Sequence, residues 1–413
     1  MKAFLILIFS LLTSQTAFAK TIYVGKGEKI TSIKDAIGMA QPGDTIIIRS
    51  GIYKEGNLQI NKRISLLGEN FPVLDGEHKY EILTITANGV TVAGLKLVNT
   101  GTSSLNDLAG IKILKARNVY VKGNELENTF FGIYLSNSNN CQVEGNKLHA
   151  TAKEEYEIGN GIHAWKCDSI KISNNQVIGH RDGIYFEFVT NSYITTNQSE
   201  NNKRYGLHFM FSHNDEYRNN TFKGNGAGVA VMYTKGVKMY NNQFDHNWGS
   251  SSYGLLLKEI SDSHIEGNVF HKNSIGIFME GGNRNKILSN SFNENGYALK
   301  LSASCDDNLI GKNNFQQNTF DLVTNGSLVL NTVESNYWDR YEGYDLNRDG
   351  VGDVPYRPIS LYGTIVERMP TTILLWRSFL VFLMDRAEKA IPLITPENLK
   401  DNLPAMKPYD FNR

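Results

Sequence analysis

Apolar and polar residues alternate in short runs through the middle of the chain, and the same run recurs at nearly constant spacing. A glycine starts each run, and the residues one and three places after it are apolar in nearly every copy. The residue eleven places after the glycine is apolar as well. Alternation with a period of two is typical of strands with one buried face and does not fit a helix. The pattern therefore predicts two or three short strands in every repeat.

Asparagine occupies one fixed place in each repeat, fourteen residues after the glycine. The glycines of the eight most regular copies are Gly110, Gly132, Gly161, Gly183, Gly206, Gly228, Gly254 and Gly276. The matching asparagines are Asn124, Asn146, Asn175, Asn197, Asn220, Asn242, Asn268 and Asn290. Most starts lie about 22 residues apart, and a ninth, longer copy begins at Ala298. Self-similarity at this period predicts a solenoid.

Short strands with asparagine and glycine at the corners predict the kind of solenoid. We expect an all-β, right-handed parallel β-helix with coils of about 22 residues. Asparagines stacked at one corner would hydrogen-bond from coil to coil, as Asn does in turns. Phenylalanines in a common frame position would fill the interior beside that corner: Phe222, Phe244, Phe270 and Phe292.

The segments outside the regular repeats have distinct patterns. Residues 1–19 have the charged end, apolar run and small-residue cleavage site of a secretory signal peptide. Residues 20–109 predict an N-terminal cap, with a short amphipathic helix over 32–40, followed by irregular coils. The regular β-helix is expected over 110–335. Residues 336–370 are acidic and rich in glycine and aromatic residues, and 371–413 predict an apolar helix and a C-terminal tail.

Charge and cysteine content narrow the classes of partner. The chain has 42 basic and 42 acidic residues, and removal of the leader takes away Lys2, which leaves a charge near −1. A chain of this charge is a poor candidate for binding nucleic acid or anionic membrane as its main partner.

Cys141, Cys167 and Cys305 are an odd count for an exported protein. Cys141 stands where other repeats have valine or isoleucine, so we expect a buried side chain, with a disulfide between coils as the less favoured alternative.

The positions two and four places after each glycine face outward and stack in two ladders. In the middle of the rod they place His163 and His208 in one ladder, with Met210 and Met232 in the other, and His213 follows at the turn. Met210 shares a strand with His208, and Met232 lies one coil further on, about 5 Å away. Thioether and imidazole groups together suit Cu(I). These five residues are copper candidates; alternatively, a loop or partner covers the methionines, which then make only apolar contacts.

A second candidate metal site lies in the acidic region. Asp345, Asn347, Asp349 and Asp353 with Gly350 resemble the first half of a calcium loop, in which alternate oxygens surround a hard cation. The twelfth position is a tyrosine instead of the usual bidentate glutamate. The spacing therefore predicts either a Ca2+ site or a simple acidic turn.

The apolar run over 373–384 is expected to be helical. It is too short to span a bilayer and carries Arg377. It either caps the open end of the rod or docks on a partner. The candidates for partner binding are Leu374, Leu375, Trp376, Phe379, Leu380, Phe382 and Leu383.

An enzyme is the main alternative class, because many exported β-helices cleave or epimerise acidic polysaccharides. Glu187 with Asp182, or His208 with Asp215 and Glu216, are the side chains available for such chemistry. A lyase needs a basic residue beside the uronate carboxylate, and the central ladder positions have none. A hydrolase needs a carboxylate pair at one level of the groove, and Glu187 has no acidic neighbour in either ladder. A purely structural adhesin is a third option.

Four stretches of the chain occur in a recognisable order: Pro-Gly-Asp-Thr at 42–45, Arg-Tyr-Gly-Leu-His-Phe-Met at 204–210, Met-Tyr-Thr at 232–234 and Asn-Tyr-Trp-Asp at 336–339. In these stretches the chain resembles the NosD family, the periplasmic maturation proteins of nitrous oxide reductase. With the leader, the loop over 345–353 and the apolar tail, the resemblance covers the whole mature chain. The β-helix itself is shared with many carbohydrate-binding and sugar-hydrolase-like proteins and says little about function.

The resemblance implies a non-enzymatic role in assembling the copper sites of nitrous oxide reductase. The implied partners are an ABC transporter made of an ATPase and a membrane permease, a lipoprotein copper chaperone, and apo nitrous oxide reductase as the recipient. The implied location is the periplasm, at the inner-membrane transporter. The family favours transient Cu(I) at His208, Met210 and Met232 and a docking role for the tail, although it fixes no ligand residue by residue and adds nothing to the Ca2+ prediction. A secreted polysaccharide-active enzyme stays the alternative.

Overall fold

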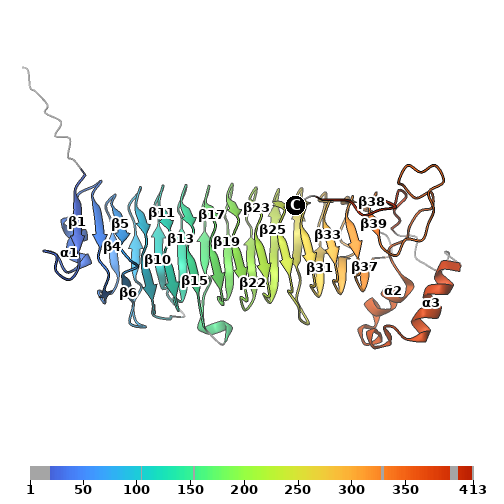
Figure 1. The fold of residues 1–413 in the computed structure, drawn as a ribbon, viewed down its shortest axis with the longest axis horizontal. Helices are drawn as coiled ribbons and strands as arrows, with labels where there is room; N and C mark the ends of the chain where they lie inside the picture. The colour runs from blue at the N-terminus through green and yellow to red at the C-terminus, as the bar shows by residue number, and fades with distance from the viewer. Residues whose placement is uncertain (1–18, 104, 152–153, 327–329, 391–398, 412–413) are drawn as a thin grey trace, which may run out of the picture.

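The computed structural model describes residues 19–103, 105–151, 154–326, 330–390 and 399–411. The predicted signal peptide lies outside these residues, apart from its last position. The described chain coils into a long rod of three parallel β-sheets, each built by stacking one short strand per coil (Figure 1). The predicted parallel β-helix is confirmed.

Sheet A runs along the whole rod. Its 14 parallel strands lie in chain order. They are β1 (Thr21–Val24), β2 (Thr45–Ile48), β5 (Ser65–Gly68), β8 (Thr91–Ala93), β11 (Tyr120–Lys122), β14 (Gln142–Glu144), β17 (Lys171–Ser173), β20 (Tyr193–Thr195), β23 (Glu216–Arg218), β26 (Lys238–Tyr240), β29 (His264–Glu266), β32 (Lys286–Leu288), β35 (Leu309–Gly311) and β38 (Thr332–Glu334). The apolar residue predicted to point inward is the central residue of these strands and is buried, as at Ile172 and Met239.

Sheet B follows the asparagine corner in each coil and has 13 strands. They are β3 (Ile52–Tyr53), β6 (Val73–Asp75), β9 (Lys96–Val98), β12 (Glu125–Glu127), β15 (Lys147–His149), β18 (Gln176–Ile178), β21 (Gln198–Glu200), β24 (Thr221–Lys223), β27 (Gln243–Asp245), β30 (Val269–His271), β33 (Ser291–Asn293), β36 (Asn314–Gln316) and β39 (Tyr337–Trp338). The predicted phenylalanine stack is confirmed: Phe244 and Phe270 have ring centroids 4.6 Å apart, and the stack continues to Trp338.

Sheet C has 12 strands and carries the residues that the sequence singled out for copper. They are β4 (Leu58–Ile60), β7 (Leu83–Ile85), β10 (Ala109–Leu114), β13 (Phe131–Ser136), β16 (Ile162–Trp165), β19 (Asp182–Glu187), β22 (Tyr205–Met210), β25 (Ala227–Lys235), β28 (Leu255–Ser261), β31 (Ile275–Glu280), β34 (Tyr297–Leu301) and β37 (Phe320–Thr324). Alternate residues, such as Leu207 and Phe209, point into the core and are fully buried.

The asparagine ladder forms as predicted. The side-chain oxygen of Asn220 accepts hydrogen bonds from the backbone N–H (2.9 Å) and the side-chain amide (3.0 Å) of Asn197. The amide of Asn220 donates to the carbonyl of Ile194 at 2.9 Å. The series runs on to Asn336, where Asp401 takes the next position and accepts from the Asn336 backbone N–H at 2.8 Å. Each asparagine thus satisfies backbone groups that a corner would otherwise leave buried and unpaired.

The two ends of the rod are closed differently. At the N-terminal end, α1 (Ile33–Met39) begins at the N-cap Ser32 and buries Ile33, Ala36 and Ile37, as the amphipathic pattern predicted. At the other end, Ile359 and Leu399 join the core beside Trp338. The C-terminal cap is therefore made by the loop region and the final tail.

The apolar run does not plug the end of the rod, which corrects the capping alternative. It splits into a 3-10 helix, η2 (Pro370–Leu375), and an α-helix, α3 (Phe379–Ala390), so the expected single helix over 373–384 is also wrong. With α2 (Leu361–Arg368), these helices lie at the C-terminal end beside the last strands of sheet C (Figure 1). A further 3-10 turn, η1 (Glu155–Glu157), lies in the 150–160 insertion.

The three cysteines are free and buried, so the buried role of Cys141 is confirmed and the disulfide alternative is not realised. In the part of the chain that the structure describes, no helix combines the length and apolar character needed to cross a bilayer.

Candidate functional site

The two outward ladders of sheet C have the predicted register. His163 pairs with Tyr185, Tyr185 with His208 and His208 with Ala230. In the second ladder, Glu187 pairs with Met210 and Met210 with Met232, which pairs in turn with Lys258. The constant frame of the sequence therefore placed the two methionines correctly, on adjacent strands of one face.

The first ladder is not solvated, which corrects the expectation of an exposed histidine patch. His163 is 9 % and His208 6 % exposed. The rings cover one another: the centroids of His163 and Tyr185 are 4.7 Å apart, and those of Tyr185 and His208 are 4.9 Å apart. Tyr205 covers His208 from the start of the same strand, at 4.8 Å. An outward position alone therefore did not predict exposure, because aromatic neighbours bury each other.

His208 is held by a buried carboxylate. Its Nδ1 lies 3.4 Å from Oδ2 of Asp182, at the start of the neighbouring strand β19. Asp182 is fully buried and also accepts two hydrogen bonds from the guanidinium of Arg204, at 2.8 and 2.6 Å. Burial works to raise the pKa of Asp182, but the bonds from Arg204 and His208 outweigh it and lower that pKa. The carboxylate is thus ionised and fixes the orientation of the imidazole.

The other nitrogen of His208 has no protein partner. Nε2 is buried and makes no hydrogen bond. A buried ring nitrogen without a partner is costly and needs an explanation, such as a functional role, an ordered water or a bound ion. A carboxylate on one imidazole nitrogen with the other left open is the arrangement found around metal-binding histidines. Met210 and Met232, both partly exposed, lie on the same face of β22 and β25. We call His208, Met210 and Met232 the Met/His patch.

The structure separates the other two copper candidates from this patch. His163 lies two strands from β22, beyond the ring of Tyr185. Burial is the main cause that lowers the pKa of His163 to about 3, so its ring is neutral, and its Nδ1 lies 3.1 Å from the side-chain amide of Asn160. His213 lies at the corner, and its Nδ1 accepts the backbone N–H of Lys235 at 3.1 Å. Nε2 of His163 is buried and unpartnered, as in His208, but neither His163 nor His213 lies beside Met210 and Met232.

An exposed aromatic ladder borders the patch, and the sequence analysis missed it. Phe188, Phe211 and Tyr233 follow Glu187, Met210 and Met232 directly. Their rings stack, with centroids 5.3 Å apart for the first pair and 5.1 Å for the second. They are 45 %, 37 % and 39 % exposed. All three have a positive φ, a conformation that is uncommon for bulky residues. The sequence contains a signal for this ladder, because three consecutive coils have an aromatic residue at a frame position where other coils have Lys115, Asn137, Lys166 and Glu259.

The acidic loop bonds mainly to its own backbone. Asp345 Oδ2 accepts the N–H of Gly350 at 2.8 Å, and Asp353 Oδ2 accepts the N–H of Leu346 at 2.7 Å. Asn347 and Asp349 bond each other through their side chains at 2.9 Å. Among the described residues, the three carboxylates do not bring three ligand oxygens within 4.8 Å of one another. The Ca2+ site stays a prediction, and the geometry seen is that of an acidic turn.

The tail residues fall into two groups. Trp376 is half-buried and packs against Phe320 and Tyr362, with centroids 5.5 and 5.9 Å apart, so it anchors the tail to the rod. The remaining six candidates are 44 % to 87 % exposed: Leu374, Leu375, Phe379, Leu380, Phe382 and Leu383. They leave an apolar surface on η2 and α3.

The comparisons with known proteins point to one family. The family model described as "Periplasmic copper-binding protein (NosD)" matches residues 149–343, which contain the Met/His patch. This part of the chain is similar to that family. The NosD resemblance expected from the sequence is confirmed.

Two relatives extend the similarity to most of the chain. Both are named "Probable ABC transporter binding protein NosD". The protein of Pseudomonas aeruginosa is 28 % identical over 371 residues, which are 85 % of this chain and 86 % of the relative. The protein of Stutzerimonas stutzeri is 26 % identical over 373 residues, 86 % of this chain and 85 % of the relative.

Among solved structures, the A-module of the mannuronan C-5 epimerase AlgE6 of Azotobacter vinelandii has a similar fold. It aligns with a TM-score of 0.53 at 15 % identity, over 73 % of this chain and 92 % of that one. At this identity the likeness concerns the β-helix alone. The NosD description is that of a binding protein.

Proposed function

We propose that the protein takes part in maturing the copper sites of nitrous oxide reductase, as a periplasmic relay or docking platform. Cu(I) is its cargo: it binds transiently to the Met/His patch after delivery by a lipoprotein copper chaperone. The ATP cycle of an ABC transporter, made of an ATPase and a permease, then moves the rod between the chaperone and the apo-reductase. The NosD family description and the names of the relatives support the copper and transporter parts of this proposal.

One observation carries the proposal: the buried, unpartnered Nε2 of His208 on the same face as two partly exposed thioethers. Met210 and Met232 are Cα partners on adjacent parallel strands, about 4.8 Å apart. Soft sulfur ligands with one imidazole favour Cu(I) over harder ions. Three ligands on an open sheet face hold the ion less firmly than a closed cage, which suits a protein that must release it.

Two surfaces are available for the partners. The aromatic ladder of Phe188, Phe211 and Tyr233 borders the patch, where chaperone and reductase must approach to exchange the ion. The apolar surface of η2 and α3, with Leu374 and Phe379 as its most exposed residues, suits the permease. Exposed apolar residues gathered on one surface mark interaction sites.

Anaerobic Cu(I) titration against a chromogenic chelator tests the copper part. The informative variant is Met210→Leu/Met232→Leu, because leucine keeps the volume and apolar character but removes the sulfur. We expect one Cu(I) per chain in the native protein and at least about a 100-fold loss of affinity in the variant, since two of three ligands are gone. His208→Ala should weaken binding as well.

The matched control is Met39→Leu/Met369→Leu, which removes two exposed thioethers far from the patch, 54 % and 56 % exposed. This control should bind copper like the native protein. Unchanged binding in Met210→Leu/Met232→Leu would contradict the ligand assignment. If the native chain binds no Cu(I), the relay is contradicted, and the docking platform is the role that is left.

Co-purification with the transporter tests the docking part. Phe379→Ser/Leu383→Ser should reduce recovery of the permease and ATPase, because it makes the surface of α3 polar. Leu346→Ser is the control, since Leu346 is 79 % exposed on the acidic loop and belongs to neither η2 nor α3. Equal recovery with both variants would show that the transporter binds elsewhere.

A further inference from the structure

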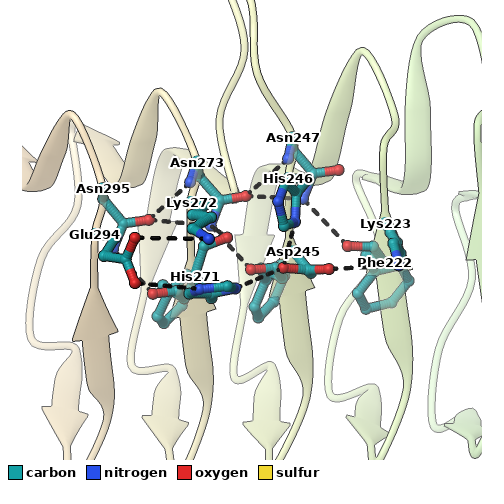
Figure 2. A network of polar contacts seen from close by, with 12 residues as sticks. Phe222, Lys223, Asp245, His246, Asn247, His271, Lys272, Asn273, Glu294 and Asn295 are labelled. Atoms are coloured by element: carbon teal, nitrogen blue, oxygen red, sulfur yellow. Dashed lines mark hydrogen bonds and ion pairs between the residues drawn. The ribbon is translucent and has the colours of Figure 1, made fainter.

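A second set of metal-ligating side chains lies on sheet B, away from the Met/His patch (Figure 2). Asp245 on β27 and His271 on β30 are Cα partners on adjacent strands, and His246 directly follows Asp245. Their ligand atoms all lie within 4.8 Å of one another. Among the described residues, no other group of three His, Cys, Asp or Glu side chains meets this condition.

The corner of the coil brings these three side chains together. Consecutive residues of a strand point to opposite faces. His246 escapes this rule because it occupies the left-handed corner, with φ of 53°, where the preceding coils have Asn201 and Gly224. Its Nδ1 lies 2.7 Å from Oδ1 of Asp245, and its backbone N–H donates to the carbonyl of His271 at 3.1 Å.

Both imidazoles converge on a single oxygen. The Nδ1 atoms of His246 and His271 lie 2.7 and 2.8 Å from Oδ1 of Asp245. Tetrahedral ligands at bond lengths of about 2.0–2.2 Å lie about 3.3–3.6 Å apart, so a small outward shift of the imidazoles would turn this hydrogen-bonded cluster into a coordination shell. The three side chains therefore offer one oxygen and two nitrogens close enough together to share one ion.

The surroundings fit an open metal site. Nε2 of His271 lies 3.8 Å from Oε1 of Glu294, which also pairs with Lys272 at 3.6 Å (Figure 2). A carboxylate on the far nitrogen of an imidazole orients it and raises its basicity toward a metal. The side chain of His246 is 52 % exposed and that of Asp245 is 23 % exposed, so water has access to complete the coordination.

We propose that Asp245, His246 and His271 form a second metal site, which binds a divalent ion such as Zn2+ through one carboxylate oxygen and two Nδ1 atoms. Two nitrogens and one oxygen without sulfur suit Zn2+, Ni2+ or Cu2+ and are a poor match for Cu(I). The site differs in ligand chemistry from the Met/His patch and lies on another sheet. It is independent of the proposed copper relay.

Zn2+ titration of the metal-free protein, in competition with a chromophoric chelator, tests this site. We expect one Zn2+ per chain. His246→Ala and His271→Ala should each lower the affinity at least about 10–100-fold, since loss of a ligand costs no less than loss of its supporting partner. Asp245→Asn should have a similar effect. All three residues lie on the surface, so urea unfolding should show native-like stability.

Two control variants make the result decisive. His264→Ala removes another surface imidazole beside a carboxylate, with Nε2 3.5 Å from Glu266, and should leave Zn2+ binding unchanged. Met210→Leu/Met232→Leu should also leave it unchanged. The assignment is overturned if the native chain binds no Zn2+, if His246→Ala and His271→Ala bind it like the native chain, or if His264→Ala loses it equally. Either of the last two results would show that the cluster is only two histidines hydrogen-bonded to one carboxylate.

Discussion

The asparagine corner and the outer face of β19, β22 and β25 belong to the same coils. Buried polar atoms are paired at the corner, whereas one is left unpaired on the outer face. At the corner, one residue type repeats from Asn124 to Asn336, and each side chain pairs with backbone groups and with the next asparagine. On the outer face the residue type varies along the ladder of Tyr185, His208 and Ala230, and Nε2 of His208 is left unpaired.

Under the proposed function, this difference separates residues that maintain the solenoid from residues that bind a ligand. Repetition lets each coil satisfy its neighbour, which is how a solenoid gains stability. Departures from the repeat that carry a local cost need another reason. Phe211 in a left-handed corner and the orphaned nitrogen of His208 are such departures, and both lie in one coil with Met210.

The largest expected loss of stability comes from replacing one asparagine of the corner ladder. Asn220→Ala leaves the backbone N–H of Asn197 and the carbonyl of Ile194 without their bonds to this side chain. We expect a loss of about 2–5 kcal/mol of unfolding free energy, measured by urea denaturation. The exposed Asn106→Ala should change it by less than about 0.5 kcal/mol. A loss below about 1 kcal/mol in Asn220→Ala would show that the ladder does not stabilise the rod.

The next prediction concerns the outer face, where Asp182 positions His208. Asp182→Asn removes the charge that orients the imidazole, so the Cu(I) affinity should fall about 10–100-fold. The same chelator competition measures it, and circular dichroism checks that the coils persist. Unchanged affinity in Asp182→Asn, with the loss in Met210→Leu/Met232→Leu retained, would show that the carboxylate serves only Arg204.

Asp215 places an acid in a frame position where other coils carry Ser192, Ser263 and Asn285. Burial raises its pKa to about 8 from 3.8, and its Oδ2 has no partner. A raised carboxyl pKa means that the folded chain holds the proton more tightly than the unfolded chain. This contribution to stability is complete below pH 4 and is lost as the pH rises toward 8.

Replacement of Asp215 should therefore act in a pH-dependent way. Asp215→Asn removes the ionisable group, and its stability relative to the native chain should rise on the order of 3–4 kcal/mol between about pH 5 and 8, at about 1.4 kcal/mol for each pH unit between the two pKa values. Urea unfolding at the two pH values measures the difference. A stability difference that is the same at both pH values would contradict the burial of this carboxyl group.

The smallest effect on stability is expected at the aromatic ladder. Phe211→Gly relieves the left-handed conformation but loses two stacked neighbours, and these terms of about 1 kcal/mol each nearly cancel. Recruitment of the chaperone or reductase should nevertheless fall. Glu259→Gly, at the same corner in another coil, controls for the backbone change. If Phe211→Gly loses more than about 2 kcal/mol in urea unfolding, the ladder is a structural element and not a docking surface.

The sequence predicted the fold because a strict frame fixes strand register. The period of two set which side chains point inward, and the spacing from glycine to asparagine set which residues become neighbours, including Met210 and Met232. The same frame also makes Asp245 and His271 neighbours, because each stands seventeen places after its glycine, Gly228 or Gly254. That pair was missed because only the outward positions of one strand per repeat were searched.

The remaining features depend on contacts that the frame does not encode. Asp182 stands before its glycine, so its approach to His208 across two strands was not visible. The burial of His208 results from the stacked rings of Tyr185 and Tyr205. The tail has no periodicity, so the break before Phe379 and the packing of Trp376 on the rod came only from the structure.

X-ray absorption at the copper edge tests the central claim, that thioethers of the Met/His patch bind the cargo. The protein is loaded anaerobically with one equivalent of Cu(I), in its native form and as Met210→Leu/Met232→Leu. The account predicts sulfur ligands with one imidazole nitrogen in the native protein, and loss of the sulfur signal in the variant. A first shell of only nitrogen and oxygen in the native protein would contradict it.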